Sequence, residues 1–213
     1  MLIYRKNLTK EELLKRNIVI DKSAIVAEGV KLECNVCVLG TSVVGKDCVV
    51  GANSVLENCE LDEGVKVLSS FISSSRVGKF STVGPFAHLR NGCEIGANCR
   101  IGNFVEIKNS KLGEKCKVAH LTYIGDAELN ENCNVGCGVV FCNYNGCVKQ
   151  KVKVGKNVFI GSNVNLIAPL VVEDNAYIAA GSTINKNIHE NDFAIARARQ
   201  ENKKGFVNPY LRK

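Results

Sequence analysis

The sequence has 213 residues, no tryptophan, one methionine, 11 cysteines and a formal net charge of +7, which suits one medium domain or one elongated repeat array. It contains no apolar run long enough to span a bilayer and no signal-peptide core, so we expect a cytoplasmic protein that does not bind membranes. The positive charge lies in residues 1–20 and 197–213, which disfavours nucleic-acid binding because a nucleic-acid reader usually carries its basic stripe on the folded body.

The N-terminal segment "LTKEELLKRN" predicts a short helix. Thr9 and Glu12 have the spacing of a capping box, and two leucines follow. Because a repeat array needs a cap at its first unit, we expect residues 1–19 to form a helical cap.

An aliphatic residue recurs every six positions between residues 20 and 190. The register slips within residues 61–76 and returns at Val77. A six-residue unit is a short strand plus a tight turn, and its even length keeps the aliphatic side chains on the inward face of every strand. Three units close one coil, and the coils stack as parallel strands about 4.8 Å apart. The repeat therefore predicts an all-β parallel β-helix of about nine coils. The aliphatic positions are Ile20, Val26, Leu32, Val38, Val44, Val50, Leu56, Val77, Val83, Leu89, Ile95, Ile101, Ile107, Leu112, Val118, Ile124, Val154, Ile160, Leu166, Val172, Ile178 and Ile184.

The cysteines follow this repeat. Those at 48, 93, 99, 116 and 133 fall at small inward positions, where a free thiol acts as a small apolar group. Only Cys34 and Cys37 have C-x-x-C spacing, and no second ligand pair follows. We therefore expect free thiols, a reducing compartment and no metal site.

Charged residues beside the inward positions point outward. Arg90 and Lys108 are one coil apart and should stack on one face, with Glu106 and Tyr123 beside them, whereas Asn134 belongs to the neighbouring face. Two stacked cations are destabilising unless an anion compensates, so this face is either a phosphate site or a solvated ladder of long side chains.

His120 falls two residues after the inward Val118, at an exposed corner. The repeat then breaks at about residues 142–153, which predicts a protruding loop carrying Asn143, Tyr144 and Lys149. It ends near residue 190, and residues 191–213 form an irregular basic extension.

Seven motifs occur in order: "VGPFAHLRNG", "IGNFVEIKNSKLG", "AHLTYIGDAEL", "NVGCGVVFCNYNG", "VFIGSNVNLIAP", "YIAAGSTI" and "AIARARQ". Together they resemble the C-terminal acetyltransferase domain of the bifunctional N-acetylglucosamine-1-phosphate uridyltransferase/glucosamine-1-phosphate acetyltransferase family. The resemblance implies a left-handed β-helix, a homotrimer and acetyl-CoA as co-substrate, with no metal required for acetyl transfer.

The resemblance also implies roles for individual residues. His120 is the general base, and Asn143 and Tyr144 position the thioester. The remaining implied binding residues are Arg90, Lys108, Tyr123, Asn134, Lys149 and Glu106 for the amino-sugar phosphate, and Cys137, Ser162, Ala180 and Arg197 for acetyl-CoA.

The sequence departs from this family at several places. Asn145 replaces an acidic loop residue, Val148 and Val152 replace polar residues, and Cys137 replaces alanine. No glycine-rich phosphate loop lies near the N-terminus. The sequence is therefore either a stand-alone acetyltransferase, for which a separate chain would supply uridyl transfer, or a fragment of the longer enzyme.

Three other functions remain open at this point. One is a hexapeptide-repeat acyltransferase with another acceptor, and another is a non-catalytic β-helix scaffold. The third is a metal hydrolase or carbonic anhydrase, which would need several histidines at one interface, whereas His88, His120 and His189 are far apart in the repeat.

Overall fold

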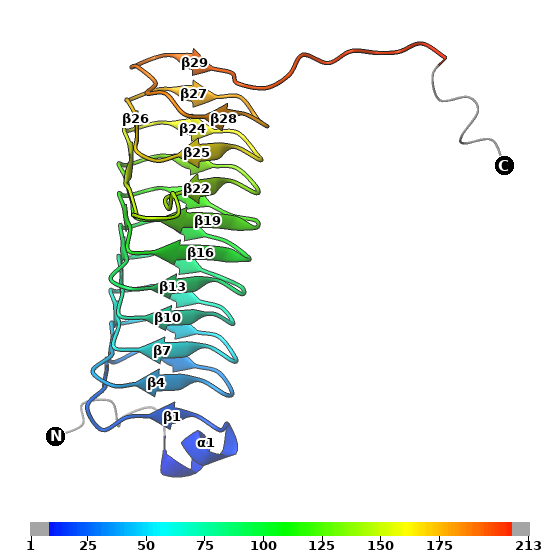
Figure 1. Cartoon of the computed structure of the whole chain (residues 1–213). Helices are drawn as coiled ribbons and strands as arrows, with labels where there is room; N and C mark the ends of the chain where they lie inside the picture. Colours follow the sequence, from blue (N-terminus) through cyan, green and yellow to red (C-terminus); the bar gives the residue numbers. More distant parts are fainter. Residues whose placement is uncertain (1–8, 206–213) are drawn as a thin grey trace.

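Short parallel strands wind around one straight axis and form three sheets along the length of the molecule (Figure 1). The structure, a computed structural model, describes residues 9–205. Within them sheets A, B and C contain ten, nine and ten strands, and every strand pairs with strands one coil away. The predicted all-β parallel β-helix is confirmed.

Sheet A consists of β1 (Val19–Ile20), β4 (Cys37–Leu39), β7 (Val55–Glu57), β10 (Phe71–Ser73), β13 (His88–Arg90), β16 (Val105–Lys108), β19 (Thr122–Gly125), β22 (Val140–Cys142), β25 (Asn165–Ile167) and β28 (Thr183–Ile184). Sheet B consists of β2 (Ile25–Val26), β5 (Val43–Val44), β8 (Glu60–Leu61), β11 (Arg76–Val77), β14 (Glu94–Ile95), β17 (Lys111–Leu112), β20 (Ala127–Leu129), β23 (Val152–Val154) and β26 (Leu170–Val172). Sheet C consists of β3 (Lys31–Leu32), β6 (Val49–Val50), β9 (Lys66–Val67), β12 (Thr82–Val83), β15 (Arg100–Ile101), β18 (Lys117–Val118), β21 (Asn134–Val135), β24 (Phe159–Ile160), β27 (Tyr177–Ile178) and β29 (Phe193–Ala194).

The aliphatic residues of the repeat form the core. All of the predicted inward positions from Val26 to Ile184 are buried, and Ile20 at the first coil is partly buried. The five cysteines expected to point inward are buried too, and all eleven cysteines of the chain are free thiols. Burial of these apolar side chains between stacked coils is the main stabilising contribution to the fold.

The coil continues without a break through residues 61–76, where the sequence pattern loses its six-residue register. Leu61, Val67 and Ile72 occupy the inward positions there, and their strands stay in register with the coils on both sides. The spacings from Leu56 to Leu61, from Val67 to Ile72 and from Ile72 to Val77 are five residues. Each of these sides is one residue shorter at its corner, so the strands and the core are unchanged.

The corners depend on asparagine more than on glycine. Asn35, Asn53 and Asn98 have φ angles of 58°, 60° and 57°, a left-handed conformation that asparagine tolerates. The glycines that follow inward residues are needed for steric room rather than for a left-handed conformation. A Cβ on Gly96 would lie 2.6 Å from the carbonyl carbon of Gly113 in the next coil, so glycine permits close stacking there.

Both ends differ from the coil body. Helix α1 (Lys10–Lys15) begins with the predicted capping box, in which Thr9 Oγ1 accepts from the Glu12 amide at 3.2 Å. Strand β29 pairs with β27 beyond residue 190, the expected end of the repeat. Residues 1–8 of the expected cap and 206–213 of the expected extension lie outside the described residues. No helix within residues 9–205 is long and apolar enough to cross a membrane.

Removing one core side chain tests the importance of coil stacking. We expect Ile107→Ala to lower the free energy of unfolding by about 2–5 kcal/mol, because the cavity cannot collapse between two stacked coils. Urea unfolding at fixed protein concentration measures the change. Leu68→Ala is the matched control, because Leu68 is 46% exposed, and an equal loss in both variants would contradict the expectation.

Candidate active site

Sheet A carries the predicted pair of stacked cations. Arg90 of β13 is in register with Lys108 of β16, as the 18-residue spacing predicted. Glu106 accepts two hydrogen bonds through Oε1, from Arg90 Nε at 2.8 Å and from Arg90 Nη2 at 2.6 Å. The Arg90 charge is therefore matched within the chain, but the Lys108 charge is not matched by Glu106.

A second lysine increases this imbalance. The pKa of Lys108 lies below its usual value, chiefly because the Lys149 ammonium is close to it; burial and Arg90 add to the effect, and the Asp126 carboxylate opposes it. Two neighbouring ammonium groups disfavour each other, and a bound anion would relieve the cost that Asp126 leaves uncompensated. Arg90, Lys108 and Lys149 form what we call the anion cluster.

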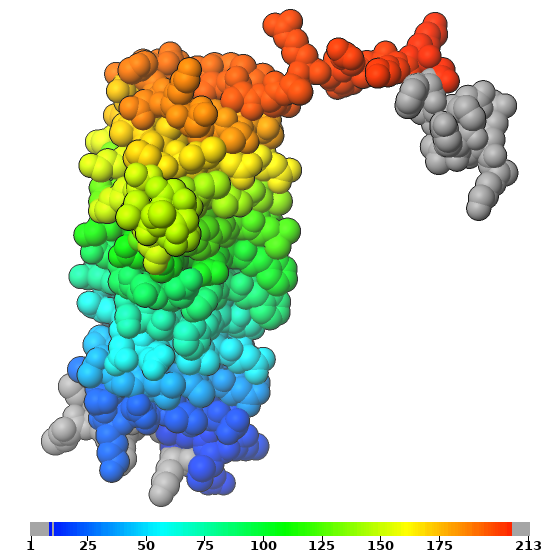
Figure 2. Space-filling model, in the orientation of Figure 1, coloured from blue at the N-terminus to red at the C-terminus, as the bar shows by residue number. Residues whose placement is uncertain are grey.

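The loop between β22 and β23 reaches the anion cluster from the A–B corner, where the chain passes from sheet A to sheet B. Figure 2 shows this loop as a bulge on the front of the molecule. A bridge between Tyr144 and Lys149 closes it, and the Tyr144 hydroxyl donates to the Gly146 carbonyl at 2.6 Å. Tyr144 is 59% exposed, so its ring is available to another molecule.

Asp126 fixes the base of this loop. Its buried carboxylate accepts hydrogen bonds from the Asn109 amide at 2.5 Å and from the Asn143 amide. Burial alone would raise the pKa of Asp126, but these hydrogen bonds hold the pKa below its usual value. Gly125 leaves room for this contact, because a Cβ there would clash with the Tyr123 hydroxyl and the Asn143 amide.

His120 lies at the opposite edge of sheet A, at the C–A corner, where the chain passes from sheet C to sheet A. It is exposed, as expected, and its φ angle is 65°. The first of three corner hydrogen bonds runs to its carbonyl from the Gly138 amide at 2.9 Å. The backbone amide of Asn163 donates to the Cys137 carbonyl at 2.7 Å, and the backbone amide of Gly181 donates to the Ser162 carbonyl at 2.8 Å. These bonds align His120, Cys137, Ser162 and Ala180, which we call the corner column.

Arg197 lies at the upper end of the corner column. The Ala196 amide donates to Ser182 Oγ at 3.1 Å, which holds the chain over this corner. The Arg197 Cδ lies 3.9 Å from the point where a Cβ on Gly181 would be. Arg197 and the four residues of the corner column, which the sequence associates with acetyl-CoA or catalysis, therefore share one edge of the solenoid.

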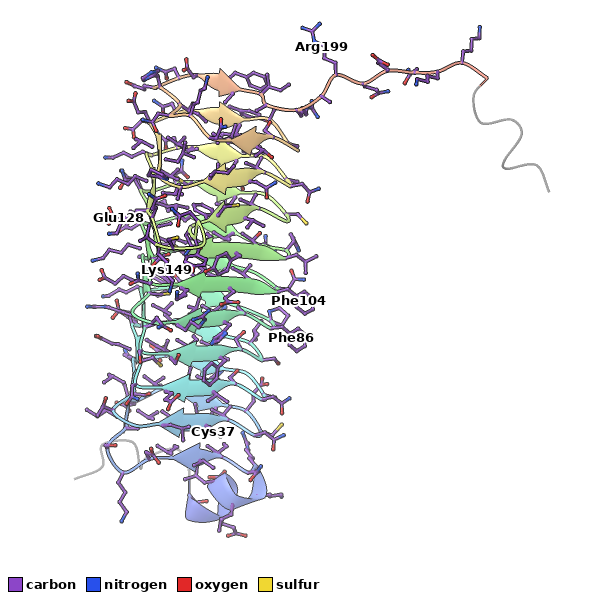
Figure 3. The ribbon with its side chains drawn as sticks, viewed as in Figure 1. Cys37, Phe86, Phe104, Glu128, Lys149 and Arg199 are labelled. Carbon is purple, nitrogen blue, oxygen red and sulfur yellow. The ribbon has the colours of Figure 1, made fainter. Side chains whose placement is uncertain are left out.

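A single chain does not bring the whole predicted site together. In Figure 3, Lys149 lies at one edge of sheet A, and Phe86 and Phe104 mark the other edge, where His120 lies. Asn134 is on sheet C, between Lys117 and Phe159. Asn143 and Tyr144 are thus separated from the corner column by the length of a sheet A strand.

Two features of the site were not predicted from the sequence. One is the anchoring role of Asp126, whose only signal was its place next to a glycine in "IGDAEL". The other is an exposed apolar patch at the C–A corner, formed by Phe86, Phe104 and Leu121, which are 59%, 52% and 67% exposed. The two phenylalanine rings stack with their centroids 5.5 Å apart.

The described residues contain no group of three or more His, Cys, Asp and Glu side chains that could hold a metal ion. His88 lies on sheet A, His120 lies at the C–A corner, and His189 lies between β28 and β29 near the C-terminal end. Within one chain, the three histidines of residues 9–205 therefore lie at separate places and form no such group.

Comparisons with known proteins agree with the six-residue repeat. Residues 74–109 and 151–186 match the family described as bacterial transferase hexapeptide (six repeats), and residues 42–67 match the hexapeptide repeat of succinyl-transferase. The bifunctional protein GlmU of Clostridium novyi is 50% identical over 198 residues, which include 93% of this chain. The chain belongs to the hexapeptide-repeat family that includes the GlmU proteins.

The relatives are longer than this chain. The GlmU protein of Alkaliphilus oremlandii is 44% identical and matches over 96% of this chain but only 47% of its own length. The chain thus spans about half the length of these relatives and corresponds to their C-terminal half.

A solved structure supports the fold. The UDP-N-acetylglucosamine acyltransferase LpxA of Bacteroides fragilis has a TM-score of 0.51 and 18% identity, over 80% of this chain and 66% of that one. The fold is the left-handed parallel β-helix that the resemblance implied.

The Asp126 contact predicts how the loop is held. We expect Asp126→Ala to release Asn143 and the loop, and so to speed cleavage between Asn143 and Lys151 in limited proteolysis. The stabilisation should be present above the usual aspartate pKa of about 3.9 and be lost as the pH falls through the lowered pKa. Asp174→Ala, on a distant corner, is the control; unchanged cleavage in Asp126→Ala would show that other contacts hold the loop.

Proposed function

We propose that this protein transfers acetyl from acetyl-CoA to the amine of glucosamine 1-phosphate, giving N-acetylglucosamine 1-phosphate and CoA. The observation that carries the proposal is the corner column, which aligns His120 with Cys137, Ser162 and Ala180 beside a sheet bearing the anion cluster. The relatives named GlmU, over the part that this chain spans, support the same reaction class.

The acceptor would bind on sheet A. Its phosphate is suited to the anion cluster, because charge-assisted bonds to phosphate would offset the repulsion between Lys108 and Lys149. Glu106 orients Arg90 for this contact, and the Tyr123 hydroxyl lies over Gly125, the register partner of Lys108. Asn134 would contact the acceptor from a second copy of the chain.

His120 would act as the general base. An ammonium is not a nucleophile, so one proton must leave the amine before the nitrogen attacks the thioester carbonyl, and histidine suits proton transfer near neutral pH. The first amine proton goes to solvent, and the second passes to His120 as the N–C bond forms; the C–S bond then breaks, CoA leaves as the thiolate, and the imidazolium gives the proton to that sulfur. An N–H donor would stabilise the negative charge that develops on the carbonyl oxygen, a role that the Asn143 amide of another copy could fill with the N–H that Asp126 does not accept.

Acetyl-CoA would lie along the corner column. The three steps from His120 to Ala180 cover roughly 14 Å at about 4.8 Å per coil, so the extended arm of acetyl-CoA would pass several of these corners. Backbone groups of Cys137, Ser162 and Ala180 would bind the amides of the arm, and Arg197 would meet its phosphates. The free thiols of the chain fit the reducing cytoplasm in which we place this reaction.

A homotrimer would complete the site. The corner column and Asn134 are separated from the anion cluster and Tyr144 within one chain, but sheet A of one copy can face the C–A corner and sheet C of the next. The apolar patch of Phe86, Phe104 and Leu121 favours this arrangement, because such a patch beside a functional site is typical of an interface. In sheet B, by contrast, Arg76 pairs with Glu60 and Lys111 with Glu94, as on a solvated face.

Replacing the base tests the reaction. We expect His120→Ala to lower the rate of thiol release from acetyl-CoA with glucosamine 1-phosphate by roughly a hundredfold or more, with unchanged assembly. His189→Ala is the matched control, because His189 is also exposed but lies at the far end of the solenoid. Full activity of the His120→Ala variant would refute the role of His120 as the base. If the unaltered protein released CoA with another amino sugar but not with glucosamine 1-phosphate, the result would favour an acyltransferase with a different acceptor.

Mixing variants tests whether the site is shared. Lys108→Ala and Asn134→Ala should each be nearly inactive alone. If each site takes Lys108 from one copy and Asn134 from another, unfolding and refolding the two variants together should restore part of the activity, because some sites receive both intact residues. No recovery in mixed trimers would contradict a shared site.

A further inference from the structure

Three aromatic side chains stack on the outer face of sheet C near its C-terminal end. Phe159, Tyr177 and Phe193 occupy the same position on the adjacent strands β24, β27 and β29. Their ring centroids are 4.6 Å and 5.5 Å apart, with interplanar angles of 14° and 28°. Because neighbouring rings are one coil apart and nearly parallel, their faces point along the solenoid axis. We call this set the aromatic stack.

The aromatic stack ends in an open ring face. The exposed fractions rise along it, from 38% for Phe159 to 46% for Tyr177 and 62% for Phe193. β29 is the terminal strand of sheet C, so within residues 9–205 no further strand covers Phe193. Phe193 also lines a hollow of about 250 Å³ at this end of the solenoid, together with Ile184 and Ile195.

The open end lies close to the top of the corner column and to two cations. Tyr177 precedes Ala180 by only three residues on the same stretch of chain. Arg197 lies over Gly181, and Arg199 follows on the exposed extension that leaves the solenoid here (Figure 3). A ligand that runs up the corner column from His120 therefore reaches the level of β29 with positive charge beside it.

We propose that the Phe193 end of the aromatic stack binds the adenine ring of acetyl-CoA, with the nucleotide phosphates directed to Arg197 and Arg199. This inference rests on the proposed function. Bases stack on aromatic side chains, and the adenine would add a fourth ring to the existing three. A protein partner packed sideways on sheet C would meet the edges of these rings, whereas a planar ring added at the end meets a full face.

Comparing two donors separates nucleotide binding from chemistry. The donors are acetyl-CoA and S-acetyl-4′-phosphopantetheine, which lacks the 3′-phosphoadenosine 5′-phosphate portion of CoA. We expect Phe193→Leu to lower kcat/KM for acetyl-CoA by about tenfold, through KM, and to leave kcat/KM for the truncated donor unchanged. Phe193→Tyr should behave as the unaltered protein does, because it keeps the ring. Phe80→Leu is the matched control, because Phe80 is a similarly exposed phenylalanine at the B–C corner.

Two results would overturn the inference. One is an equal effect of Phe193→Leu on both donors, which would indicate a general disturbance of the site. The other is a change in oligomeric state by light scattering, which would place the aromatic stack in a subunit interface. Calorimetric titration with adenosine 3′,5′-bisphosphate gives a readout without catalysis. Weaker binding to Phe193→Leu supports the inference even if the chain transfers no acetyl from either donor, an outcome that would sink only the proposed reaction.

Discussion

The structure depends on the register between successive coils. Each coil can bury its aliphatic residues only against the coils above and below, so the parallel pairing of strands and the inward column of side chains form together. Everything at the surface is consequently arranged in columns along the axis. Residues far apart in the sequence, such as His120 and Ala180, share one edge because each follows an inward residue by the same number of positions.

This arrangement divides the surface into faces with different chemistry. Sheet B alternates charges that pair with each other, sheet A carries the anion cluster, and sheet C changes from lysine and arginine to aromatic rings toward its C-terminal end. A rigid solenoid cannot fold one face onto another. A ligand that needs groups from two faces must therefore bind where separate copies meet, which is why the proposed chemistry is tied to assembly.

The fold could be predicted almost completely from the sequence, because the inward position repeats and burial enforces it. The stacking of Arg90 on Lys108 and the exposure of His120 followed from the same count. The contact between Lys108 and Lys149 could not be predicted, because the loop path is not periodic. The separation of Asn143 from the corner column could not be predicted either, because a motif gives the order of residues along the chain but not the edge of the solenoid on which each residue lies.

The five-residue sides at Leu56–Leu61 and Val67–Ile72 have a consequence for how such chains diverge. A corner can lose a residue while both flanking strands keep their partners. A deletion inside a two-residue strand would instead exchange the inward and outward positions of the side chains that follow it. Length variation should therefore accumulate at corners in related proteins. The matched residues 42–67 include the five-residue side at Leu56–Leu61, so a shortened corner does not hide the repeat from such a comparison.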